Sequence, residues 1–98
     1  MGISKIELMP NQEKLASWIS NYPNLLKYWD FETRDCDLVK LKAEMQRLSP
    51  DENIMARFFV GVWLGVNTLD FDVMTAVATL NDQHLVYIKS WINEPFWP

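Results

Sequence analysis

The chain has few of the residues from which reactive and metal-binding sites are usually built. Its 98 residues include a single cysteine, Cys36, and a single histidine, His84. One cysteine cannot make an internal disulfide, which fits a reducing compartment such as the cytoplasm. Metal sites usually bring together several His, Cys or carboxylate ligands at recognisable spacing, and the sequence shows no such spacing. We therefore expect no metal and no cofactor.

Basic residues are also scarce. Nine Lys and Arg residues are outnumbered by 13 Asp and Glu residues, so the formal net charge at pH 7 is −4. Binding to a phosphate backbone relies on clustered positive charge. A turn near Leu48 could begin a helix-turn-helix, but the helix after it offers only Asn53 and Arg57 to reach base edges. We expect no nucleic-acid partner, and a nucleic-acid-binding regulator is the least favoured alternative.

No hydrophobic run is long enough to span a membrane. A spanning helix needs about 20 apolar residues, whereas the apolar segment at residues 54–66 is shorter and contains Arg57. The first residues, MGISKIELMPN, lack the basic and apolar regions of a signal peptide, and they do not fit the myristoylation pattern. We expect a cytoplasmic protein with no membrane partner.

The clearest structural signal is the start of a helix at Ser49. The Ser49 hydroxyl can accept a bond from a free backbone N–H, Pro50 suits the first helical position, and Glu52 can bond back to the cap. The residues that follow are apolar on nearly every side, and a helix of this kind must be covered by other elements. This pattern predicts a buried central helix at residues 50–66, with Asn67 as its stop.

Apolar residues recur at helical spacing in the rest of the chain, which predicts an all-α fold. We expect a compact single-domain bundle, residues 1–98, of about five helices around the central one. The helices are predicted near residues 11–20, 35–48, 50–66, 70–80 and 82–93, with a short turn near Leu25 and with Thr68 or Asp70 capping the fourth helix. The predicted core includes Leu38, Leu41, Phe58, Phe59, Val62, Met74, Val77, Leu85 and Ile88.

Gly61 and Gly65 form a GxxxG pattern within the central helix. Glycine is less favourable than alanine inside a helix, so two glycines at this spacing indicate that another element packs closely against them. We favour close approach of another helix of the same chain. A homodimer seam is the alternative.

The candidates for chemistry are weak. Cys36 lies between two aspartates whose charges oppose a reactive thiolate, and nothing in the sequence brings it to His84. Asp70 and Asp72 are two residues apart, which suits helix capping better than shared proton chemistry. We therefore expect no catalytic activity and no catalytic residue.

Aromatic residues are the most suggestive feature for function. They gather at Tyr28, Trp29 and Phe31 and again at Phe96 and Trp97. They could fold back to complete a small core, which needs large side chains. They could instead form an exposed surface that anchors a partner, because Trp and Tyr are enriched at binding hot spots. These five residues are our candidates for partner binding.

The sequence thus favours a small acidic interaction or regulatory module that binds another protein, with a homodimer as one possible assembly. The alternative is a ligand-binding bundle or small enzyme whose pocket lies between helices. For that alternative we expect a pocket lined by Trp29, Trp63 and Met74.

Overall fold

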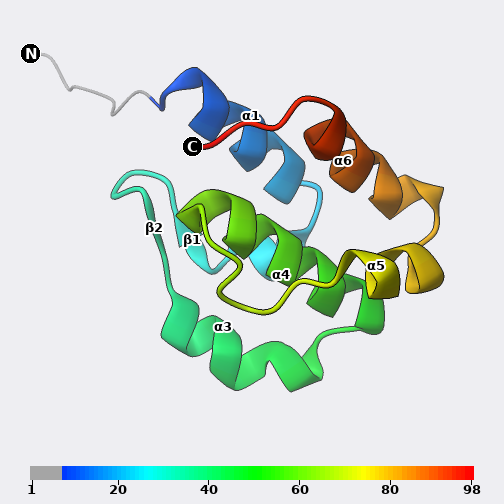
Figure 1. The fold of residues 1–98 in the computed structure, drawn as a ribbon. Helices are drawn as coiled ribbons and strands as arrows, with labels where there is room; N and C mark the ends of the chain where they lie inside the picture. Colours follow the sequence, from blue (N-terminus) through cyan, green and yellow to red (C-terminus); the bar gives the residue numbers. More distant parts are fainter. Residues whose placement is uncertain (1–7) are drawn as a thin grey trace, which may run out of the picture.

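The computed structural model describes residues 8–98, which form a helical fold with one very short hairpin (Figure 1). The elements are α1 (Pro10–Ile19), α2 (Pro23–Leu26), β1 (Trp29–Asp30), β2 (Asp35–Cys36), α3 (Leu38–Glu44), a 3₁₀ turn (Met45–Arg47), α4 (Pro50–Leu64), α5 (Val73–Thr79) and α6 (Asp82–Asn93). The predicted all-α class is confirmed, and α1, α3, α4, α5 and α6 correspond to the five predicted helices. The single domain predicted for residues 1–98 stays a prediction, because residues 1–7 lie outside the described part.

The central helix, α4, begins as predicted. The backbone N–H of Glu52 donates to Ser49 Oγ over 3.1 Å, and the backbone N–H of Ser49 donates to Glu52 Oε1 over 3.1 Å. The helix ends earlier than predicted, because Gly65 adopts a left-handed conformation with φ of 73°. Glycine takes this conformation at little cost, so Gly65 and not Asn67 terminates the helix.

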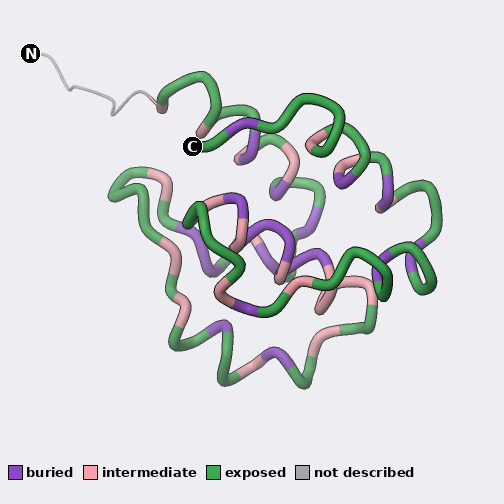
Figure 2. Tube along the Cα trace, viewed as in Figure 1, coloured by how far each residue is buried: buried purple, intermediate pink, exposed green. Residues whose placement is uncertain are grey.

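The core surrounds α4 (Figure 2). α1 contributes Leu15 and Ile19, and α2 contributes Leu25, all fully buried. α1 itself begins at Pro10, one residue before its predicted start. Of the predicted core, Leu38 is half-buried, and the following residues are buried: Leu41, Phe58, Phe59, Val62, Leu85 and Ile88.

The sequence predicted the wrong buried face for α5. Met74 and Val77 were expected in the core but are 78% and 61% exposed. α5 is short and is capped by Asp72, which accepts a bond from the Thr75 backbone N–H over 3.2 Å. Thr68 and Asp70 therefore do not cap this helix. The residue that α5 buries is the small Ala76, so the helix lies close to the core while its larger side chains face outward.

The helix predicted for residues 35–48 is divided into three parts. Asp35 and Cys36 form β2, which pairs antiparallel with β1. Asp37 then caps α3 by accepting a bond from the Lys40 backbone N–H over 3.1 Å, and a 3₁₀ turn follows the helix. The buried Trp29 of β1 fixes the hairpin against the core, a long-range contact that the local helical pattern does not contain.

Candidate functional site

An apolar groove of about 370 Å³ lies beside the C-terminal half of α4. Its deepest lining comes from the buried residues Phe58 and Val62 of α4 and Ile88 of α6. Half-buried aromatic rings stand over them at Phe71 and Trp91, and their ring centroids lie 5.4 and 6.1 Å from that of Phe58. The groove is thus formed by α4, α6 and the segments that follow these helices, together with Val73 of α5.

The edge of the groove carries apolar side chains that remain in contact with water. Val66 is 60% exposed, Val73 43%, Ile92 55% and Trp97 56%. Of the described residues that line the groove, none is charged. Exposed apolar area is unfavourable, by about 25 cal/mol per Å² that could be removed from water. Four such side chains lie around one apolar groove. Covering this surface with a partner is therefore favourable.

Both glycines of the GxxxG pattern line this groove. A Cβ atom at Gly61 would lie 3.8 Å from Val66 O and 3.9 Å from Asn67, in the turn after α4. A Cβ atom at Gly65 would lie 4.0 Å from the Trp97 ring. The predicted crossing of another helix at these glycines is therefore wrong: a turn and the C-terminal segment approach them.

The C-terminal segment is held in place by several contacts, and they position Trp97. It returns along α1 (Figure 1), where the buried Phe96 ring lies 5.3 Å from the Trp18 ring. The indole N–H of Trp91 donates to Phe96 O over 2.9 Å. Trp97 packs edge-on against Trp91 with ring centroids 5.1 Å apart, and Asn11 Nδ2 donates to Trp97 O over 3.3 Å. Trp97 thus sits at the groove edge on a fixed backbone.

The five aromatic residues predicted to bind a partner do not form one exposed surface. Tyr28, Trp29 and Phe96 are 2%, 7% and 8% exposed, so they complete the core. Phe31 is half-buried against α4. Trp97 alone of the five is largely exposed, and its role in binding stays a prediction.

The pocket expected for the ligand-binding alternative is not formed by the predicted residues. Trp29 is buried and Met74 is exposed. The Trp63 ring packs against the Phe31 ring, with ring centroids 5.8 Å apart. The apolar groove beside α4 uses residues that the sequence pattern did not single out for function, among them Val66, Val73 and Ile92. The one local signal for it was the run GVNTL at residues 65–69, which is uncharged although it follows the end of α4.

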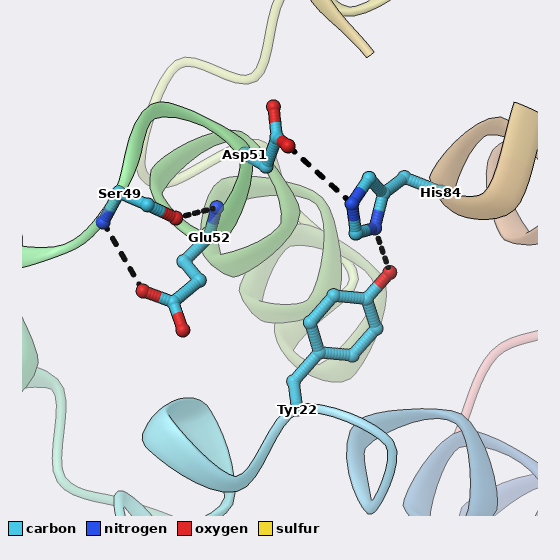
Figure 3. Close-up of polar contacts among 5 residues, drawn as sticks. All are labelled: Tyr22, Ser49, Asp51, Glu52 and His84. Carbon is cyan, nitrogen blue, oxygen red and sulfur yellow. Dashed lines mark hydrogen bonds and ion pairs between the residues drawn. The ribbon is translucent and has the colours of Figure 1, made fainter. Parts of the chain in front are cut away.

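A polar cluster joins α4, α6 and the residue before α2 (Figure 3). Tyr22 Oη and His84 Nδ1 are hydrogen-bonded at 2.7 Å, and His84 Nε2 lies 3.5 Å from Asp51 Oδ2. Tyr22 is 7% exposed, and burial, followed by the charges of Tyr87 and Asp51, raises the pKa of its hydroxyl. The Tyr22 hydroxyl is therefore protonated and buried at neutral pH, which suits a structural link better than a nucleophile.

Glu52 extends the capping box of α4 to a neighbouring element. Its Oε2 accepts a bond from Asn24 Nδ2 over 2.7 Å, while Oε1 accepts from the Ser49 backbone N–H. The bond from Asn24, followed by those with Ser49, lowers the pKa of Glu52. This carboxylate is thus fully engaged in joining α2 to the start of α4.

The remaining candidates for chemistry are also engaged or suppressed. Burial, followed by the charges of Asp35 and Asp37, raises the pKa of the Cys36 thiol to about 12, so the thiol is protonated at neutral pH. His84 faces Tyr22 and Asp51, so no Cys36–His84 dyad is formed. Within residues 8–98, no three His, Cys, Asp or Glu side chains gather closely enough to hold a metal ion.

None of the helices in the described part of the chain combines the length and the apolar character needed to cross a bilayer. Comparison of the chain with protein-family models, with curated proteins and with solved structures finds no match in any of the three. What the protein does therefore has to be inferred from the groove and the residues around it.

Proposed function

We propose that this chain is a protein-interaction module that binds a partner protein through the apolar groove and has no catalytic activity of its own. The observation that carries the proposal is the exposed apolar edge formed by Val66, Val73, Ile92 and Trp97. Continuous exposed apolar surfaces on soluble proteins often mark interaction sites. Tryptophan is also among the residue types that contribute most to binding interfaces.

The polar groups of the chain support binding rather than catalysis. The Cys36 thiol is protonated at neutral pH, the Tyr22 hydroxyl is buried against His84, and Asp72 caps a helix. A catalytic site requires a nucleophile or a base that can reach a substrate. The groove, by contrast, offers apolar area, which is what a protein partner covers.

A second candidate function is the binding of a small apolar molecule in the same groove. Its volume of about 370 Å³ lies within the range of ligand pockets. Such pockets usually present polar groups that orient the ligand, but Asn67 and Trp91 in this lining already bond to Phe71 and Phe96. Thermal unfolding with a metabolite collection tests this candidate, because a specific ligand raises the melting temperature.

The proposal can be tested by affinity capture from the native cell with matched variants. Ile92 and Val86 are both on α6 and are 55% and 51% exposed, but only Ile92 lines the groove. We expect Ile92→Gln and Trp97→Ala to reduce recovery of the partner by about tenfold or more, as loss of an apolar side chain that a partner covers does. The control variant Val86→Gln should recover the partner to the same extent as the unchanged chain.

Circular dichroism and urea unfolding must show that all three variants stay folded. If Ile92→Gln and Val86→Gln reduce recovery equally, or if neither groove variant reduces it, the groove is not the binding site and the proposal fails.

A further inference from the structure

We propose that Tyr22, His84 and Asp51 form a pH-sensitive link between the start of α6 and the elements packed against it. The link holds while His84 is neutral, and it weakens when His84 takes up a proton. This proposal goes beyond the proposed function and does not depend on what binds the groove. It follows from the direction of the hydrogen bonds at His84 and from the burial of the groups that make them.

The His84 ring is placed between partners from two other parts of the fold (Figure 3). Its Nε2 lies 3.5 Å from Asp51 Oδ2 in the first turn of α4, and its Nδ1 lies 2.7 Å from Oη of Tyr22, the residue before α2. A carboxylate only accepts hydrogen bonds, so a neutral His84 carries its hydrogen on Nε2. Nδ1 is then an acceptor, and the Tyr22 hydroxyl donates to it.

The Tyr22 hydroxyl depends on this acceptor. Tyr22 is 7% exposed, and within residues 8–98 its Oη has His84 as its one hydrogen-bond partner. Burial, followed by the charges of Tyr87 and Asp51, raises the pKa of this hydroxyl, so it keeps its hydrogen at neutral pH and below. A protonated His84 carries hydrogens on both ring nitrogens, so Nδ1 can no longer accept. The Tyr22 hydrogen then loses its partner in a buried position, which is unfavourable.

The contact with Asp51 compensates for this loss only in part. The Asp51 side chain is 42% exposed, and ion pairs with exposed partners contribute little to stability. The His84 side chain is 13% exposed, so its new charge is poorly hydrated. His84 also lies in the first turn of α6, where the helix dipole disfavours a cation. Protonation therefore weakens the folded state, whereas in the unfolded chain the charged ring is fully hydrated.

The other titratable groups near this ring are turned to different partners. The Tyr87 hydroxyl, on α6, accepts a bond from Asn21 Nδ2 over 2.9 Å. Asp82 is exposed in the first turn of α6, and Glu52 is used in the capping box of α4. Within residues 8–98, no Lys or Arg forms a recorded contact with His84. The response of the ring is thus set by the two partners described above.

The link acts on a helix that also forms the groove. His84 is in the first turn of α6, and Ile88, Trp91 and Ile92 further along the same helix line the groove. Acid therefore weakens the attachment of the helix that provides one wall of the groove.

Urea unfolding of the full chain between about pH 8 and about pH 5 tests the proposal, because histidine ordinarily changes its charge in this range and His84 is the single histidine. The unfolded chain binds the proton more readily, so stability should fall as the pH falls. We expect the folding equilibrium constant to decrease by about tenfold, the scale of one lost hydrogen bond at a buried group. His84→Gln cannot titrate and should remove most of this decrease.

Variants of the two partners should change the decrease in opposite directions. Tyr22→Phe removes the hydroxyl that loses its acceptor, so the decrease should become smaller. Tyr87→Phe is the matched control, because its hydroxyl bonds to Asn21 and not to His84, and it should keep the full decrease. Asp51→Asn removes the charge that favours the protonated ring, so the decrease should become larger.

Long-range ¹H–¹⁵N NMR spectra of the unchanged chain provide a test that does not rely on any variant folding. At about pH 8 the His84 ring should carry its hydrogen on Nε2. A hydrogen on Nδ1 would overturn the proposal. So would stability that is equal or higher at pH 5, a decrease that persists in full in His84→Gln, or equal decreases in Tyr22→Phe and Tyr87→Phe.

Discussion

At the scale of single residues, the two aromatic residues at the end of the chain have different roles. Phe96 is 8% exposed and packs against Trp18, whereas Trp97 is 56% exposed at the groove edge. Adjacent positions in an extended segment point to opposite sides, so one ring reaches the core while the other stays at the surface. Completion of the core, one of the two alternatives that the sequence left open for the aromatic residues, thus applies to Phe96, whereas Trp97 is exposed and its role in binding stays a prediction.

This difference predicts unequal effects on stability. Phe96→Ala should lower the free energy of unfolding by about 3 kcal/mol, since it removes a buried ring and leaves a cavity. Trp97→Ala should lower it by about 1 kcal/mol or less, because the ring is largely exposed. Urea unfolding followed by circular dichroism measures both. Equal losses would show that Trp97 is part of the core and is not available to a partner.

A second residue-scale prediction concerns acid. The bond from Asn24, with those from Ser49, lowers the pKa of Glu52 from its usual 4.5 in the folded state. The ionised carboxylate therefore stabilises the native state above about pH 4.5, and this contribution is lost as the pH falls through the folded pKa. Stability should decrease in acid, and the decrease should be smaller for Glu52→Gln.

Urea unfolding at several pH values below about 5 measures this difference. Asp72, whose pKa is also lowered, remains in the variant, so some acid sensitivity should persist. Curves for the two proteins that differ by a constant at every pH would contradict a stabilising role for ionised Glu52.

At the scale of elements, the sequence predicted best where a few neighbouring residues decide the structure. The capping box at Ser49 was readable, because its partner Glu52 is only three residues away. The exposed face of α5 was not readable, because the pattern of Met74 and Val77 resembles that of a buried face. Which side of a short helix is buried depends on what packs against it, and here the small Ala76 makes that contact.

Gly61 within α4 and Gly65 at its end give an element-scale prediction in which the two substitutions change stability in opposite directions. Gly65 has φ of 73°, so Gly65→Ala should lower the free energy of unfolding by about 1 kcal/mol. Gly61 is within the helix, and a Cβ atom there meets its neighbours at 3.8 Å or more. Gly61→Ala should therefore raise stability by up to about 1 kcal/mol. Changes of the same sign in urea unfolding would contradict this account of how α4 ends.

At the scale of the whole molecule, the groove is a product of distant parts of the chain. Val62 belongs to α4, Phe71 to the segment after it, Ile92 to α6 and Trp97 to the C-terminal segment. Sequence patterns indicate which face of one helix is apolar, but they do not show which faces remain uncovered after folding. The all-α class could be predicted from periodicity, whereas most of the candidate site could not.

The most direct test of the groove as the binding site is site-specific photo-crosslinking in the native cell. The photoreactive amino acid benzoylphenylalanine would replace Ile92 in one chain and Val86 in another, since both positions are exposed on α6 and only the first lines the groove. A partner that covers the groove should form a crosslink from position 92 and little or none from position 86. Crosslinks of equal yield from both positions, or a partner that crosslinks only from position 86, would contradict the account.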